Sequence, residues 1–92
     1  MVIEATAARL AALGDPTRLR ILQVLRGGER CVCELRTSVD VPPNLLSYHL
    51  KVLRDAGVVE GTRRGRWVDY RLVPAALDEI RRVLTGEGDD AE

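Results

Sequence analysis

The feature that most constrains the fold is an apolar stripe inside residues 43–57. Leu46, Leu50 and Leu53 recur at the helical period within this segment, so they fall on one side of a helix. Pro43 suits the first turn of a helix, and Gly57 suits the position just past its end. The pattern predicts an amphipathic helix whose leucine face packs on a small core.

The segments around this helix set the order of the elements. Residues 58–64 and 66–73 are two strand-like runs with a turn near Gly65, so they predict a hairpin. Further helices are expected at residues 3–13, 33–38 and about 74–84, and one more begins at Pro16 after the N-cap Asp15 and is ended by Gly27-Gly28. This order predicts a mainly α (α+β) fold, a winged helix-turn-helix with about five helices and one β-hairpin wing.

The chain is short enough for a single core. It has 92 residues, 46% of them apolar, and we expect residues 1–84 to form one DNA-binding and dimerisation domain. Residues 85–92 carry four acidic side chains and no basic one, which predicts a disordered acidic tail. There is no membrane-length apolar run and no leader pattern, so we expect a cytoplasmic protein with no membrane partner and with reduced thiols.

A net charge of zero hides a basic segment, because residues 43–72 carry six basic and three acidic side chains. Opposite the leucine stripe, the helix presents hydrogen-bonding groups suited to base edges and phosphates, and the hairpin adds arginines. An ordinary solvated helix face is the alternative, as is a half-buried, hydrogen-bonded ring for His49. The residues predicted to contact double-stranded DNA are Asn44, Ser47, Tyr48, His49, Lys51, Arg63, Arg64 and Arg66.

Both cysteines of the chain lie one residue apart, at Cys31 and Cys33. Thiolates bind soft ions, and two neighbouring thiolates form a chelate. On an ideal helix, positions i and i+2 are roughly 200° apart, whereas in an extended strand they share a side. The pair therefore predicts a soft-ion site that requires a frayed or extended helix start, and a ligand there would favour an unwound helix.

Four co-linear segments resemble the ArsR/SmtB family of bacterial metalloid- and metal-sensing repressors. They are LGDPTRLRILQVL, CVCEL, NLLSYHLKVLRDAGVV and RRGRWVDYRL, and the resemblance spans roughly residues 8–84. It implies a homodimer joined through the first and last helices, and operator binding that is lost when an inducer binds. The family's C-V-C-D-L-C sensor corresponds to Cys31, Cys33 and Glu34-Leu35, but Arg36 stands where the third cysteine would be.

Metal-binding side chains that the family uses and this sequence lacks narrow the set of inducers that the resemblance implies. Family sites for cadmium or lead recruit further N-terminal cysteines, and residues 1–30 contain none. Family sites on the last helix use histidines, and residues 74–92 contain none. We expect trivalent arsenic, antimony or an organoarsenical at Cys31 and Cys33. The third position would be filled by water, a small thiol, a neighbouring chain or a carbon substituent.

Other functions stay open at this stage. The same cysteines suit a thiol-redox sensor, and they are also consistent with two core residues that lie together by chance. A winged helix that binds protein and not DNA is a further alternative. No permanent cofactor and no catalytic residue is expected, and a thiol–disulfide oxidoreductase is disfavoured because the chain has no Cys-x-x-Cys motif.

Overall fold

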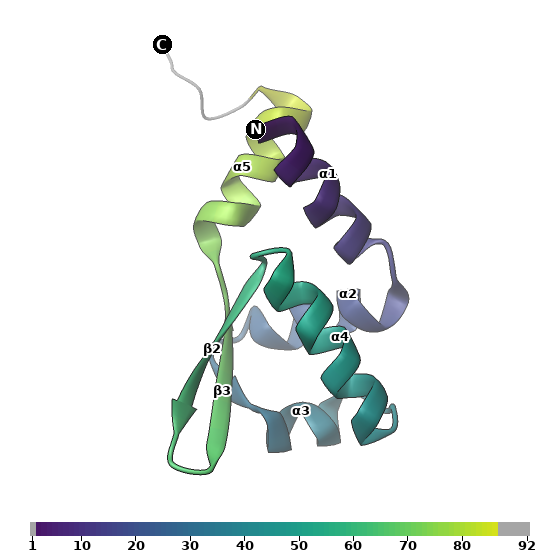
Figure 1. Cartoon of the computed structure of the whole chain (residues 1–92), viewed down its shortest axis with the longest axis vertical. Coiled ribbons are helices and arrows are strands. Elements are labelled where there is room, and N and C mark those ends of the chain that lie inside the picture. The colour runs from purple at the N-terminus through teal and green to yellow at the C-terminus, as the bar shows by residue number, and fades with distance from the viewer. Residues whose placement is uncertain (1, 87–92) are drawn as a thin grey trace.

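The computed structural model describes residues 2–86, which form five helices and a three-stranded antiparallel sheet (Figure 1). The predicted winged helix-turn-helix is confirmed. Residues 87–92 of the predicted acidic tail lie outside the described residues. In chain order the elements are α1 (Val2–Leu13), α2 (Pro16–Leu25), β1 (Arg30–Cys31), α3 (Val32–Ser38), α4 (Pro43–Asp55), β2 (Val59–Arg64), β3 (Trp67–Leu72) and α5 (Pro74–Thr85).

The leucine face of α4 packs inward as the sequence predicted. Leu46, Leu50 and Leu53 are at most 2% exposed and join a core that α2, α3 and the start of β2 also supply. Leu45, which lies outside the stripe, is 44% exposed. Gly57 follows the helix with φ 78°, a conformation that suits glycine and turns the chain into the wing. The core thereby fixes which face of α4 is left for a partner.

The sheet contains one strand that the sequence did not predict. Its order is β1–β3–β2, and β1 pairs with β3 through Arg30 opposite Tyr70 and Cys31 opposite Asp69. Two residues are too few to give an alternating pattern, so the sequence contains no signal for β1. This short strand attaches the start of α3 to the middle of β3 in the wing.

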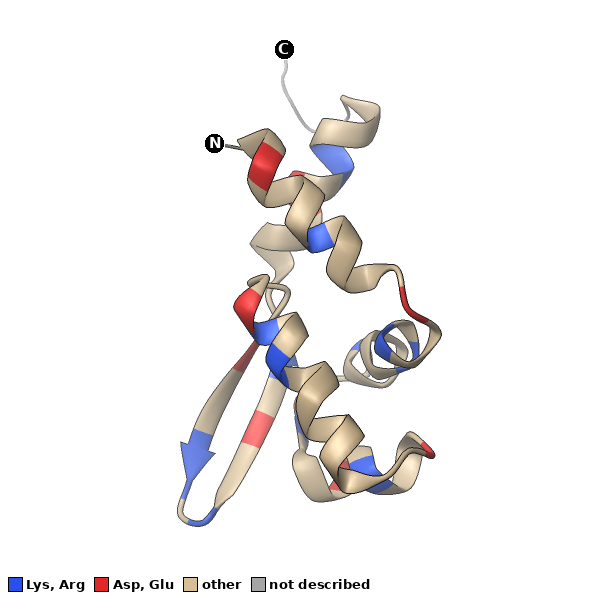
Figure 2. Cartoon of the chain, turned by 45° about the vertical axis from the view of Figure 1, so that its right-hand side comes forward, with Lys and Arg blue, Asp and Glu red and all other residues tan. Residues whose placement is uncertain are grey.

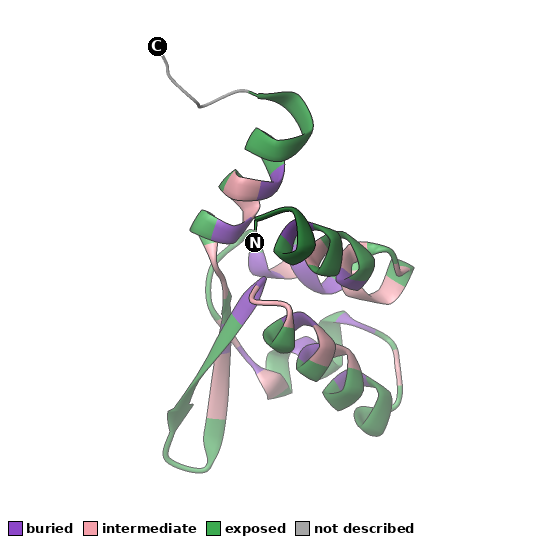
Figure 3. Cartoon of the chain, turned by 45° about the horizontal axis from the view of Figure 1, so that its top comes forward, coloured by how far each residue is buried: buried purple, intermediate pink, exposed green. Residues whose placement is uncertain are grey.

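Helices α1 and α5 lie side by side at the end of the molecule away from the wing tip (Figure 1). Arg9 of α1 joins them to the rest of the fold: it pairs with Glu79 of α5 and donates to the carbonyl of Ala56 just after α4. Much of the outer surface of both helices is exposed (Figure 3). The large apolar side chains left exposed there are Val2, Ile3, Leu10, Val83 and Leu84.

Candidate nucleic-acid interface and cysteine site

The outward face of α4 carries most of the predicted DNA contacts. Asn44, Ser47, Tyr48 and Lys51 are all exposed, and the ring of Tyr48 is among the most exposed large side chains of the fold. Lys51 is ion-paired with Asp55 one turn later, at 2.7 Å between Nζ and Oδ2. Both groups of this pair are well exposed, so it contributes little stability and Lys51 can exchange its partner readily. The face is polar and carries few charges.

His49 has a different environment from its neighbours on α4. Its side chain is 12% exposed, and its Nδ1 lies 3.0 Å from Nη1 of Arg18 on α2. Arg18 also donates through Nε to the carbonyl of Ala12, and its backbone N–H donates to Asp15, the N-cap of α2. That backbone hydrogen bond is the main reason why the pKa of Asp15 is lowered. The half-buried, hydrogen-bonded ring is therefore present, and a DNA contact by His49 stays a prediction.

The tip of the wing gathers three arginines around the turn at Gly65, whose φ is 63° (Figure 2). Arg64 forms two hydrogen bonds with Asp69, at 2.7 Å from Nε and 3.2 Å from Nη2. This pairing lowers the pKa of Asp69 and raises that of Arg64. Arg63 contacts only the carbonyl of Gly65, at 3.5 Å, and Arg66 has no polar partner within residues 2–86. Among the described residues, two of the three cations thus have no carboxylate partner.

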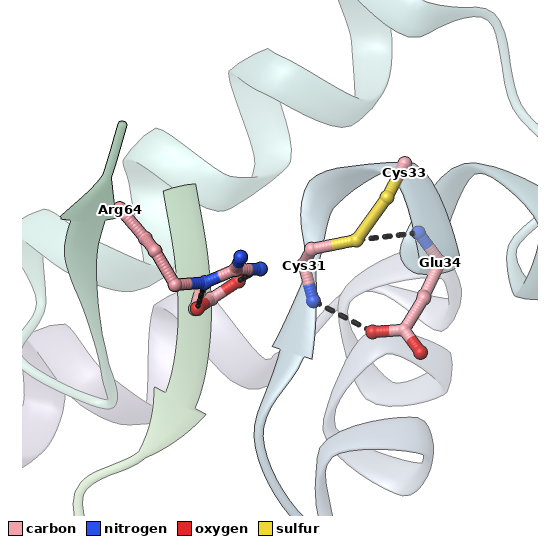
Figure 4. Close-up of polar contacts among 5 residues, drawn as sticks. Cys31, Cys33, Glu34 and Arg64 are labelled. Carbon is pink, nitrogen blue, oxygen red and sulfur yellow. Dashed lines mark hydrogen bonds and ion pairs between the residues drawn. A yellow bond between two sulfur atoms is a disulfide. The ribbon is translucent and has the colours of Figure 1, made fainter. Parts of the chain in front are cut away.

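The structure joins Cys31 and Cys33 as a disulfide with Cα atoms 5.3 Å apart (Figure 4). Cys31 is 8% exposed, whereas Cys33 is exposed. Cys31 lies in extended backbone, at φ −74° and ψ 160°, and α3 begins at the next residue. The extended geometry expected for the pair is present. In the disulfide form the two sulfurs meet with α3 formed from Val32, and unwinding by a bound ligand stays a prediction.

Cys31 is also the N-cap of α3. Its Sγ accepts a hydrogen bond from the backbone N–H of Glu34 at 3.4 Å, and the Glu34 carboxylate accepts from the backbone N–H of Cys31 at 2.9 Å. This reciprocal pair is a capping box, a motif usually built on serine or threonine. Any ligand that binds the sulfur of Cys31 therefore acts on the group that starts α3.

The cysteine pair is a neighbour of the wing. Cys31 lies directly opposite Asp69 in the β1–β3 pairing, and such cross-strand residues have Cβ atoms about 5 Å apart. Asp69 in turn accepts a hydrogen bond from Arg64, and the negative charge of Glu34 also helps to raise the pKa of Arg64 (Figure 4). The sequence did not predict this link, because β1 has no signal of its own. Within residues 2–86, no group of three or more His, Cys, Asp and Glu side chains is arranged to hold a metal ion.

None of the helices in residues 2–86 has the length and apolar character needed to span a bilayer.

Sequence comparison relates the chain to known regulators. The family model described as "Bacterial regulatory protein, arsR family" matches residues 15–61. The chain is 46% identical over 91 residues to the HTH-type transcriptional repressor SmtB of Mycobacterium tuberculosis, covering 98% of this chain and 67% of that protein. It is 44% identical over 63 residues to the arsenical resistance operon repressor of Escherichia coli K12, covering 67% and 54%.

Comparison with solved structures points to the same family. An ArsR-like transcriptional regulator from Rhodococcus sp. RHA1 superposes with a TM-score of 0.83 at 32% identity, covering 94% of this chain and 81% of that one. The homodimeric winged helix-turn-helix DNA-binding domain Mb0332 from Mycobacterium bovis gives 0.76 at 30% identity, covering 92% and 82%. The chain belongs to the arsR family of bacterial regulatory proteins and is a winged helix-turn-helix transcriptional regulator, not an enzyme.

Proposed function

We propose that this protein is a cytoplasmic, homodimeric repressor that binds operator DNA and releases it when a trivalent arsenical or antimonite binds Cys31 and Cys33. The observation that carries the proposal is the position of the two sulfurs. They meet at the start of α3, the first helix of the helix-turn-helix, and beside the wing. One small ligand at this point adjoins the first helix of the helix-turn-helix and the strand of the wing that carries Asp69.

The proposed DNA contacts divide into two groups. The outward face of α4 enters the major groove, where uncharged donors and acceptors read base edges. The wing arginines bind phosphates, which adds affinity for any sequence. The proposed contacts are Asn44, Ser47, Tyr48, His49 and Lys51 on α4 and Arg63, Arg64 and Arg66 on the wing.

Dimerisation is proposed to use the outer surfaces of α1 and α5. Both helices keep large apolar side chains exposed, among them Ile3 at 65% and Leu84 at 62%. The related domain from Mycobacterium bovis is described as homodimeric. Two-fold symmetry would place the two α4 helices about 34 Å apart, one turn of DNA, over an inverted repeat.

The chemistry of the reduced pair suits trivalent arsenic. Two thiols condense with arsenous acid, As(OH)₃, to give a dithiolate As–OH and two molecules of water. With methylarsenous acid, CH₃As(OH)₂, the same condensation completes all three bonds to arsenic, two to sulfur and one to carbon. Exposed Cys33 is the accessible thiol for the first bond, and Cys31 closes the chelate. An organoarsenical therefore needs nothing beyond the two sulfurs of one chain.

Release of DNA would follow from the second role of Cys31. Arsenic bound to its Sγ competes with the hydrogen bond from the N–H of Glu34, and it alters the β1–β3 pairing that adjoins Asp69. A ligand that prefers this altered arrangement shifts the population away from the DNA-binding one. A coupling of about 1–3 kcal/mol would weaken operator binding roughly 5–150-fold.

Serine substitution tests the proposal. Cys31→Ser and Cys33→Ser should each abolish release by phenylarsine oxide while operator affinity stays within about twofold, because serine retains the size and, at position 31, caps a helix well. Binding to a duplex enriched by the wild-type protein from a randomised library is followed by gel shift. Serine variants that still release DNA at the wild-type arsenical concentration would contradict the assignment of the site.

The disulfide favours a second candidate, a thiol-redox sensor. In that case peroxide takes two electrons and two protons from the thiols, forms the disulfide and is reduced to two molecules of water. Diamide would act in the same way and become the corresponding hydrazine. The two candidates differ in one respect that can be measured: the redox sensor releases DNA with oxidant alone, and dithiothreitol restores binding.

A further inference from the structure

The hydrogen bonds around Arg18 fix how the ring of His49 carries its proton. Nη1 of Arg18 lies 3.0 Å from Nδ1 of His49, within hydrogen-bond distance. A guanidinium has N–H groups on every nitrogen and no acceptor. Nδ1 must therefore accept, which requires that it carry no proton. The proton of a neutral imidazole then sits on Nε2.

Two charged groups face Nδ1 of the ring. The guanidinium of Arg18 lies within hydrogen-bond distance of Nδ1. The carboxylate of Asp15 lies 4.0 Å from Nδ1, beyond hydrogen-bond distance, and accepts from the backbone N–H of Arg18. From α4 itself the neighbour is Tyr48, whose ring centroid is 5.2 Å from that of His49. Arg18 is in turn held by the carbonyl of Ala12.

We infer that Arg18 is a positioning residue that holds His49 as the tautomer protonated at Nε2, so that α4 offers DNA a neutral N–H donor. The inference rests on the proposed function and deepens it. Acceptors for this donor are phosphate oxygens and the N7, O6 and O4 atoms of the major groove. An uncharged donor displaces no counterion, so His49 should affect affinity without changing the salt slope.

The tautomer can be measured directly, because His49 is the only histidine of the chain. Long-range ¹H–¹⁵N correlation spectra of protein labelled at histidine should report the proton on Nε2 in the wild type. Arg18→Lys keeps a cationic donor and should preserve this form, whereas Arg18→Met should lose the preference. A wild-type ring that carries its proton on Nδ1, or on both nitrogens at neutral pH, would overturn the inference.

Two substitutions of His49 separate the two sides of the ring. Asparagine places its amide near Nδ1 and can still accept from Arg18, but it offers nothing at the ε position. Glutamine places an N–H donor near Nε2. On a duplex that the wild-type protein has enriched from a randomised library, His49→Asn should lose about tenfold in affinity, the size of one lost hydrogen bond. His49→Gln should stay within about threefold, a fraction of one hydrogen bond.

The outcomes separate the inference from the function on which it rests. Equal losses in His49→Asn and His49→Gln, with thermal unfolding unchanged, would show that the ε position offers no donor to DNA and would overturn the inference alone. A salt slope changed by His49→Asn would do the same, since a neutral contact predicts parallel plots. A wild-type protein that enriches no duplex would overturn the proposed function together with the contact.

Discussion

Helix α4 and the wing both face the proposed DNA site, but the fold holds them in different ways. Helix α4 is seated by three buried leucines and by the clamp of Arg18 on His49. Of β2, only Val59 is buried, and the wing beyond it is held by the β2–β3 pairing and by the ion pair between Arg64 and Asp69. The helix is therefore packed on the core by one face and exposes a mostly uncharged one, whereas the tip of the wing is exposed and cationic. We therefore propose that discrimination between DNA sequences belongs to α4 and that general affinity for DNA belongs to the wing.

The largest loss of stability should come from truncating a buried leucine of α4. Leu53→Ala truncates a side chain that is 0% exposed, and such changes cost about 2–5 kcal/mol of unfolding free energy. The matched control is Leu45→Ala on the same helix, at a side chain 44% exposed, where a change within about 0.5 kcal/mol is expected. Urea unfolding at one fixed protein concentration measures both. Equal losses would mean that the leucine stripe does not seat the helix.

Substitutions on α4 and on the wing test whether the two regions contribute differently to DNA binding. Arg66→Ala should weaken binding to every duplex and reduce the salt slope by about one, because one phosphate contact is lost. Asn44→Ala or Tyr48→Ala should instead cost about 1–3 kcal/mol on the operator with little change on random DNA. Affinities are measured by anisotropy over a range of salt concentrations. An Arg66 variant whose affinity equals that of the wild type at every salt concentration would remove the wing from the DNA site.

Much of this division could be predicted from the sequence, because it depends on local patterns. The leucine stripe, Gly57 and the arginines beside Gly65 each give a signal within a few residues. The start of α3 was predicted one residue late, since cysteine is not a usual N-cap. The partners of His49 and Arg64 could not be found in this way. Arg18 is 31 positions from His49, and Asp69 reaches Arg64 only through the register of the hairpin.

A smaller effect is expected at the cap that links the cysteines to α3. Glu34→Ala removes the acceptor for the N–H of Cys31 and should cost about 1 kcal/mol, as the loss of a cap does. Glu34→Gln keeps an acceptor oxygen and serves as the control. Urea unfolding compares the two under reducing conditions. If both variants unfold as the wild type does, the capping box contributes nothing to stability.

The smallest effect on DNA affinity should come from releasing Arg64 of the wing from its ion pair with Asp69. Asp69→Asn releases Arg64 from its carboxylate and should raise the affinity for all duplexes slightly, by less than Arg64→Ala lowers it. Because pairing lowers the pKa of Asp69 in the folded protein, its stabilising effect is complete above the ordinary aspartate range. The effect is lost as the pH falls through the lowered value.

Stability curves of wild type and Asp69→Asn should therefore converge on acidification. Asp78→Asn, which breaks an exposed pair with Arg81 on α5, is the control and should leave DNA affinity unchanged. Curves for the wild type and the Asp69 variant that stay parallel from neutral to acidic pH would argue against the pairing in solution.

A ligand on Cys31 and Cys33 is proposed to control the DNA-binding surfaces of the protein. The most direct measurement is the anisotropy of a labelled operator duplex bound to wild-type protein reduced with a phosphine, during titration with phenylarsine oxide. A phosphine is used because dithiols would capture the arsenical. We expect release that is complete near one arsenical per chain, with antimonite acting in the same way. Release by diamide alone, with no response to any arsenical or to antimonite, would contradict the claim.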